Sequence, residues 1–145
     1  MVTGFRSAMI MLVIQFLLGM AVNLFVTIPT DHPGARPAEY FSGVVQSVTW
    51  AILHGHALLI LHASLGLLLV ISAFGLLVQA IQTRLRAMTV VTSFGAFGVL
   101  EAGFNGGSFL NYNQDFSSML IASFVAGAVV AYTIGLYVIA RPAKA

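Results

Sequence analysis

The sequence predicts an all-α fold, a polytopic membrane four-helix bundle, on three observations. Of the 145 residues, 59% are hydrophobic and only 7% are charged, whereas soluble domains carry about 25% charged residues. Four apolar runs have the length of about 20 residues that crosses the hydrocarbon of a bilayer. Finally, Arg and Lys are distributed asymmetrically between the connections, as in multi-pass membrane proteins. We therefore expect a single membrane domain over residues 1–145.

The transmembrane segments are expected at about 7–28, 57–80, 87–107 and 116–140. Each must be helical, because lipid offers no partner for free backbone N–H and C=O groups. The first run ends at Pro29. It is longer than the h-region of a signal peptide, roughly 7–15 residues, and no A-x-A-like site follows it. We interpret it as a retained first helix.

The basic residues predict the orientation of the chain. One side of the membrane is expected to receive Arg6, Arg84, Arg86, Arg141 and Lys144. The other side receives Arg36 together with Asp31, Glu39 and Asp115. Cytoplasmic loops carry an excess of Lys and Arg. This pattern predicts that both termini are cytoplasmic (N-in/C-in).

The segment 38–54 between the first two transmembrane runs has its own pattern. Apolar residues recur there at helical spacing, at Phe41, Val44, Val45, Val48 and Ile52, with polar residues on the opposite side. Such a pattern is typical of an amphipathic helix. Trp50 and Tyr40 suit the headgroup zone. We expect a helix on the outer interface or, as an alternative, an extension of the second transmembrane helix.

Small residues recur at four-residue intervals in the last two transmembrane runs. They are Gly98, Ala102 and Gly106 in one run and Ser123, Gly127, Ala131 and Gly135 in the other. This spacing lets helix backbones approach closely in a membrane. The pattern predicts tight packing of these two helices on each other, or a seam between two copies in a homodimer.

Polar residues inside the membrane are costly and attract functional hypotheses. Gln15 is one, and the others lie toward the outer side. From the 1.5 Å rise per residue, His62 and Glu101 each lie about 9 Å inside the outer boundary, which predicts a hydrogen-bonded pair. With Asn105 and Asn23 they form the predicted cofactor-binding residues of an outward-opening pocket. The alternative is a pair that only holds the helices together.

A metal site is a second interpretation of the same region. The predicted ligands are His54, His56, His62 and Glu101, because imidazole and carboxylate groups suit zinc or copper. His54 and His62 flank one face of a continuous helix. His54 and His56 are two residues apart and do not converge on a helix, so both can bind one ion only if the chain unwinds at Gly55.

Haem b is a third interpretation. Ligation by two histidines usually takes them from two helices, but only the second run supplies histidine inside the membrane. Axial ligation would therefore need His62 with Met20 or Met119, or His62 from two protomers.

Several function classes are excluded. The chain has no cysteine, so disulfides and thiolate sites are absent. The basic residues form no stripe, which argues against nucleic acid as a partner. No G-x-S-x-G, phosphate loop or dinucleotide motif is present. We therefore expect no catalytic residues and a protein that is not an enzyme.

Three functions remain open from the sequence. The first is a lipid-embedded binding protein whose outer pocket holds a metal ion, haem, a quinone or a small polar ligand. The second is an accessory or structural subunit of a larger membrane complex. The third is a small oligomeric transporter or channel that uses Glu101 as its proton or cation site.

Three stretches of the sequence carry a resemblance. They are Asn23-Leu-Phe-Val-Thr-Ile-Pro-Thr-Asp-His-Pro-Gly, Glu39-Tyr-Phe, and Gly103-Phe-Asn-Gly-Gly-Ser-Phe-Leu-Asn-Tyr. Together they resemble uncharacterised small integral membrane proteins of high-GC bacteria, and from this resemblance we expect the chain in the plasma membrane of a bacterium. The resemblance implies the four-helix layout and carries no activity, cofactor or partner.

Overall fold

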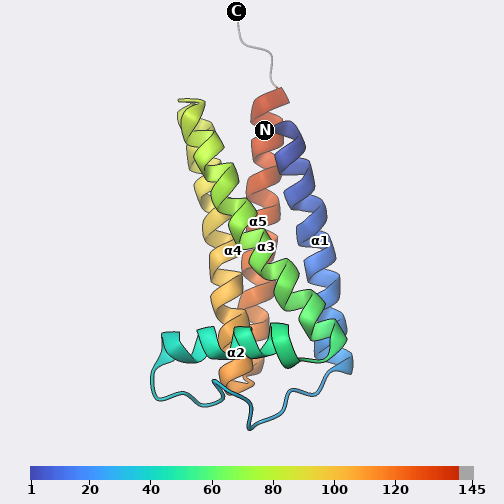
Figure 1. Cartoon of the computed structure of the whole chain (residues 1–145). Helices are drawn as coiled ribbons and strands as arrows, with labels where there is room; N and C mark the ends of the chain where they lie inside the picture. Colours follow the sequence, from blue (N-terminus) through green and yellow to red (C-terminus); the bar gives the residue numbers. More distant parts are fainter. Residues whose placement is uncertain (141–145) are drawn as a thin grey trace, which may run out of the picture.

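The computed structural model describes residues 1–140, and this part of the chain forms five α-helices. Four are long: α1 (Val2–Phe25), α3 (Ala57–Gln82), α4 (Arg86–Tyr112) and α5 (Asp115–Ala140). The shorter α2 (Tyr40–His54) lies across one end of the other four (Figure 1). The predicted all-α four-helix bundle is confirmed. Arg141 and Lys144, which entered the orientation prediction, lie outside the described residues.

The four long helices are long and apolar enough to cross a membrane. The most apolar 18-residue windows have a mean hydropathy of 2.2 in α1, 2.4 in α3, 1.4 in α4 and 2.1 in α5. Their outer surfaces are apolar as well, with Leu24 and Phe94 each 67% exposed. Such a surface is stable in lipid and prone to aggregation in water. The chain is thus a multi-pass membrane protein.

Each long helix packs against two of the other three. α1 and α4 do not contact each other, and both contact α3 and α5. The order around the bundle is therefore α1, α3, α4, α5. At the end that holds the N-terminus, Phe5, Leu12, Leu76 and Tyr132 form a tightly packed apolar core. Toward α2, a second and smaller apolar cluster contains Val22, Ala51, Leu59 and Leu110.

The small residues of α4 serve its packing on α5. A Cβ atom at Gly98 would lie 2.8 Å from the carbonyl oxygen of Phe124 and 3.2 Å from the Cβ of Ala128. Glycine is therefore needed for this close approach. Gly106 and Gly127 differ, because a Cβ at either position would meet no atom within 4 Å. The four-residue pattern is thus only partly used between α4 and α5.

The helix ends differ from the predicted ends where tertiary contacts decide them. α1 begins at Val2 and ends at Phe25, four residues before Pro29. α4 continues through the Asn- and Gly-rich stretch that the sequence suggested as a connection. It does so because Gly107 packs under Val44 of α2. α4 ends only where Asn113 adopts a left-handed conformation, with φ of 50°.

α2 and α3 are separate helices, so the interpretation of α2 as an extension of the second transmembrane helix is wrong. Gly55 has an extended backbone conformation and ends α2. His56 begins α3 as its cap, and its Nδ1 accepts from the N–H of Leu58 at 3.4 Å. At the other end of α2, the Glu39 carboxylate accepts from the N–H groups of Phe41 and Ser42 at 3.0 and 2.6 Å. Anionic caps stabilise helix N-termini.

Asn111 of α4 anchors α2 and the segment before it. When the side-chain amide is oriented so that its nitrogen faces the surrounding acceptors, this nitrogen lies 2.5 Å from Oγ of Ser47 and 3.1 Å from the carbonyl oxygen of Gly34. The carbonyl oxygens of Gly107 and Gly43 follow at 3.2 and 3.3 Å. Asn111 and Ser47 are both buried. This network joins α2, the connection before it and the end of α4.

His32 makes a second anchor in the connection between α1 and α2. Its Nδ1 lies 2.8 Å from the carbonyl oxygen of Pro33, and its Nε2 lies 3.1 Å from that of Leu110. The ring also stacks on Trp50, with 4.3 Å between centroids. We call the segment 26–56, with its contacts to α4, the cap.

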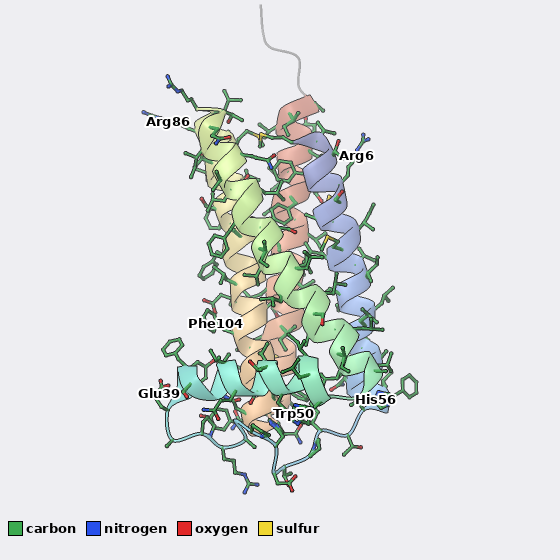
Figure 2. The ribbon with its side chains drawn as sticks, in the orientation of Figure 1. Arg6, Glu39, Trp50, His56, Arg86 and Phe104 are labelled. Atoms are coloured by element: carbon green, nitrogen blue, oxygen red, sulfur yellow. The ribbon has the colours of Figure 1, made fainter. Side chains whose placement is uncertain are left out.

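Basic and acidic residues lie mainly at opposite ends of the bundle. Figure 2 shows Arg6 and Arg86 at the end that holds the N-terminus, and Glu39, Trp50 and His56 at the end covered by the cap. Arg84 lies in the connection between α3 and α4, beside Arg86. This distribution follows the sequence pattern. The side of the membrane on which each end lies stays a prediction.

Candidate functional site

A cavity of about 400 Å³ lies inside the half of the bundle nearest the cap. All five helices contribute to its lining, and α2 contributes Val44 and Val48. The walls are mostly apolar, with polar side chains only at Gln15, Asn23, His62 and Ser118. Cavities of this size and character hold small molecules in other proteins.

Gln15 of α1 and His62 of α3 form the polar centre of this cavity. Nε2 of Gln15 donates to the backbone carbonyl oxygen of His62 at 3.1 Å. The same nitrogen lies 3.4 Å from Nε2 of the His62 ring. An amide nitrogen has two hydrogens and accepts none, so the ring Nε2 is the acceptor and Nδ1 carries the ring proton.

Two glycines make room for this pair. A Cβ at Gly19 would lie 3.0 Å from Cε1 of His62, and a Cβ at Gly66 would lie 3.0 Å from Nε2 of Gln15. On α1 the glycine follows Gln15 by four residues, and on α3 the glycine follows His62 by four residues. Residues four apart share a helix face. Each helix thus presents one polar side chain and one glycine to the other.

Two polar atoms of the pair are left without partners. Oε1 of Gln15 and Nδ1 of His62 are both buried and make no hydrogen bond within residues 1–140. Buried polar groups are normally paired, and an unpaired one costs about 1–3 kcal/mol. Both residues line the apolar cavity, and each holds one fully buried polar atom that has no partner, an acceptor on Gln15 and an N–H donor on His62.

The other predicted cofactor-binding residues are not all at this site. Asn23 lines the cavity near the end of α1. Glu101 and Asn105 do not line it, and the Asn105 amide donates to the backbone carbonyl oxygen of Glu101 at 2.8 Å. His62 is bonded to Gln15 and not to Glu101. The predicted His62 and Glu101 pair is replaced by a pair that joins α1 and α3.

The predicted metal ligands are not brought together. Within residues 1–140, no three His, Asp or Glu side chains are placed to hold a metal ion. The helix break at Gly55 leaves His54 exposed at the end of α2 and His56 exposed at the start of α3. His54 and His62 therefore do not flank one face of one helix. Of the methionines considered for haem b, Met20 lines the cavity with His62, whereas Met119 does not.

Sequence reasoning placed Gln15 inside the membrane but did not include it in the site, and it missed the two glycines and the cap anchors. Gln15 and the two glycines could have been found from a repeated spacing in the sequence. On each helix a glycine follows the polar residue by four positions, Gly19 after Gln15 and Gly66 after His62. Asn111 and His32 carried no comparable signal, because Ser47, next to Asn111, and the Leu110 carbonyl group, next to His32, lie far away in the sequence.

Comparison with known proteins adds no assignment, since no family model, curated protein or solved structure matches the chain.

Proposed function

We propose that this protein binds a lipid-soluble molecule that has an apolar body and an oxygen-bearing head group, of the quinone class. The observation that carries this proposal is the apolar cavity of about 400 Å³ that is lined by His62 and Gln15, which hold one unused donor and one unused acceptor. In the proposed complex the two side chains turn toward the cavity, so that a quinone carbonyl accepts from Nδ1 of His62 and a quinol hydroxyl donates to Oε1 of Gln15. The apolar walls hold the ring and the first part of the tail.

The proposal places the protein in the plasma membrane of a bacterium, with both termini in the cytoplasm and the cap outside. Arg6, Arg84 and Arg86, which lie at the end opposite the cap, support this orientation. The ligand reaches the cavity from the lipid, where such molecules dissolve. Among the other functions open from the sequence, a transporter would need Glu101 to face an internal pathway, and Glu101 does not line the cavity.

Thermal unfolding of the purified protein with a decyl-substituted benzoquinone tests this function. A ligand that binds only the folded state stabilises it by about 2.7 kcal/mol at 100 times its Kd. The wild-type protein is expected to gain stability with the quinone and much less with decylbenzene, which lacks the oxygen atoms. His62→Phe should remove most of the difference between these two compounds.

Two glycines supply a matched pair of variants for the same experiment. Gly106 lines the cavity and Gly75 does not, and a Cβ at either position would meet no atom within 4 Å. Gly106→Leu is expected to fill the cavity and abolish the stabilisation by the quinone, whereas Gly75→Leu should keep it. Equal stabilisation of both variants, or none for the wild-type protein, would contradict the proposal.

A further inference from the structure

The outward-facing side of α4 holds an acidic residue among aromatic ones. Val90, Phe94, Phe97 and Phe104 are 53%, 67%, 54% and 37% exposed. Glu101 lies three to four residues from Phe97 and Phe104 and seven from Phe94, so helical spacing places it on the same side, where it is half-buried. We call these five residues the α4 outer face. The opposite side of α4 carries the buried residues Thr92, Gly95, Ala96 and Val99.

The Glu101 carboxylate has no partner within residues 1–140. The only hydrogen bond that a side chain in this part of the chain makes with Glu101 goes to its backbone carbonyl oxygen, from Asn105. α2 crosses α4 at Gly107, and Glu101 lies six residues further into the bundle, about 9 Å at 1.5 Å per residue. A carboxylate at this depth in hydrocarbon is costly, and such residues normally pair with another group.

The start of α2 lies beside the α4 outer face, and the two helices form a corner there. Phe41, in the first turn of α2, is 62% exposed and packs edge-on against Phe104, with 6.0 Å between ring centroids. The Tyr40 hydroxyl is 2.6 Å from Oγ of Ser108, which fixes the angle between the two helices. Figure 2 shows Phe104 beside the end of α2 that projects past α4. The corner is therefore bounded by the α4 outer face and by Phe41 and Val45.

We propose that this corner binds a transmembrane helix of another protein, one that carries a Lys or Arg side chain at the depth of Glu101. The apolar walls suit a lipid-embedded helix, and the carboxylate selects a basic group. A second copy of this chain in the same orientation would present its own Glu101 at that depth. Arg6, Arg84 and Arg86 lie at the far end of the bundle and Arg36 lies in the cap, so the described part of a second copy supplies no basic partner.

Single-span peptides in lipid vesicles test the proposal. The chain lacks cysteine, so Thr3→Cys, at the exposed start of α1, accepts one fluorescent donor. The probe is a Leu/Ala helix with an acceptor dye and one Lys about six residues from the end that lies level with the cap. Matched peptides carry Leu at that position, or Lys at the same distance from the other end.

Energy transfer should show the first peptide binding about three- to tenfold more tightly than either matched peptide, as one interhelical polar pair allows. Glu101→Gln should remove this preference, and Asp31→Asn, an exposed carboxylate in the cap, should keep it. Glu101→Lys should restore binding to a peptide with Glu in place of Lys.

Equal binding of the three peptides would overturn the proposal. So would a preference that survives Glu101→Gln, or self-association of the chain that depends on Glu101 while the Lys peptide has no effect. Phe104 belongs both to the α4 outer face and to the cavity lining, but Glu101 does not line the cavity. Because every outcome above is measured through Glu101, none of them depends on the proposed quinone binding.

Discussion

At the scale of single residues, His62 is the centre of the site, and its partner is Gln15. The sequence predicted its depth in the membrane from the rise per residue. It did not predict the partner, because two residues at the same depth meet only if their helices are rotated toward each other. The rotation of α4 is decided by Gly98 and Gly107, which pack on α5 and α2. This leaves Glu101 on the side of α4 that faces away from the other helices.

A double-mutant cycle between Gln15 and His62 tests this pairing. Gln15→Leu and His62→Phe remove the hydrogen bonds and keep apolar bulk at both positions. We expect an interaction free energy of about 0.5–1.5 kcal/mol, the range of interhelical hydrogen bonds in membranes. The measurement is the free energy of unfolding in detergent for the wild-type protein, both single variants and the double variant.

The control is the same cycle between His62→Phe and Glu101→Gln. These residues share no contact, so their effects should add to within about 0.5 kcal/mol. A strong coupling of His62 to Glu101, with none to Gln15, would restore the pair that the sequence predicted and would contradict the geometry of the cavity wall.

At the scale of elements, the cap shows how far periodicity predicts structure. Apolar spacing predicted a helix over 38–54, and the structure has α2 over Tyr40–His54. Composition did not predict the structure between residues 103 and 115. The Asn and Gly residues there suggested a connection, but α4 continues to Tyr112. Gly107 and Asn111 of this stretch contact the cap, and single-sequence patterns do not distinguish this use from a loop.

Asn111→Leu is expected to release the cap without unfolding the bundle. The substitution keeps a side chain of similar size and leaves Ser47 and nearby carbonyl groups without their donor, at a cost of about 1–3 kcal/mol. Hydrogen exchange of the α2 backbone amides should become at least tenfold faster. Amides in the middle of α3 and α5 should keep their rates.

Gln114→Leu is the matched control, because Gln114 is exposed just after α4 and its side chain makes no described hydrogen bond. It should leave exchange in α2 unchanged. If Asn111→Leu leaves α2 protected, or accelerates exchange equally in all helices, the cap is not held by Asn111 in the way described.

At the scale of the whole molecule, the two halves of the bundle differ in packing. The half that holds the N-terminus is filled by large side chains such as Phe5 and Tyr132, which lie 5.5 Å apart between ring centroids. The other half is hollowed by the cavity beneath α2, whose lining includes the exposed residues Met20 and Phe104. The sequence predicted that polar residues gather toward the cap, but not that a cavity lies there. Cavity volume depends on the crossing of helices, which no local pattern records.

The most direct test of quinone binding is native mass spectrometry of the protein extracted from the membranes of its host. The wild-type protein is expected to retain an additional mass of a quinone-like molecule. Gly75→Leu should retain the same mass, whereas Gly106→Leu and the double variant of Gln15→Leu with His62→Phe should lose it. A wild-type protein released without any bound molecule, or a bound mass that persists in the cavity-filling variant Gly106→Leu, would contradict the central claim.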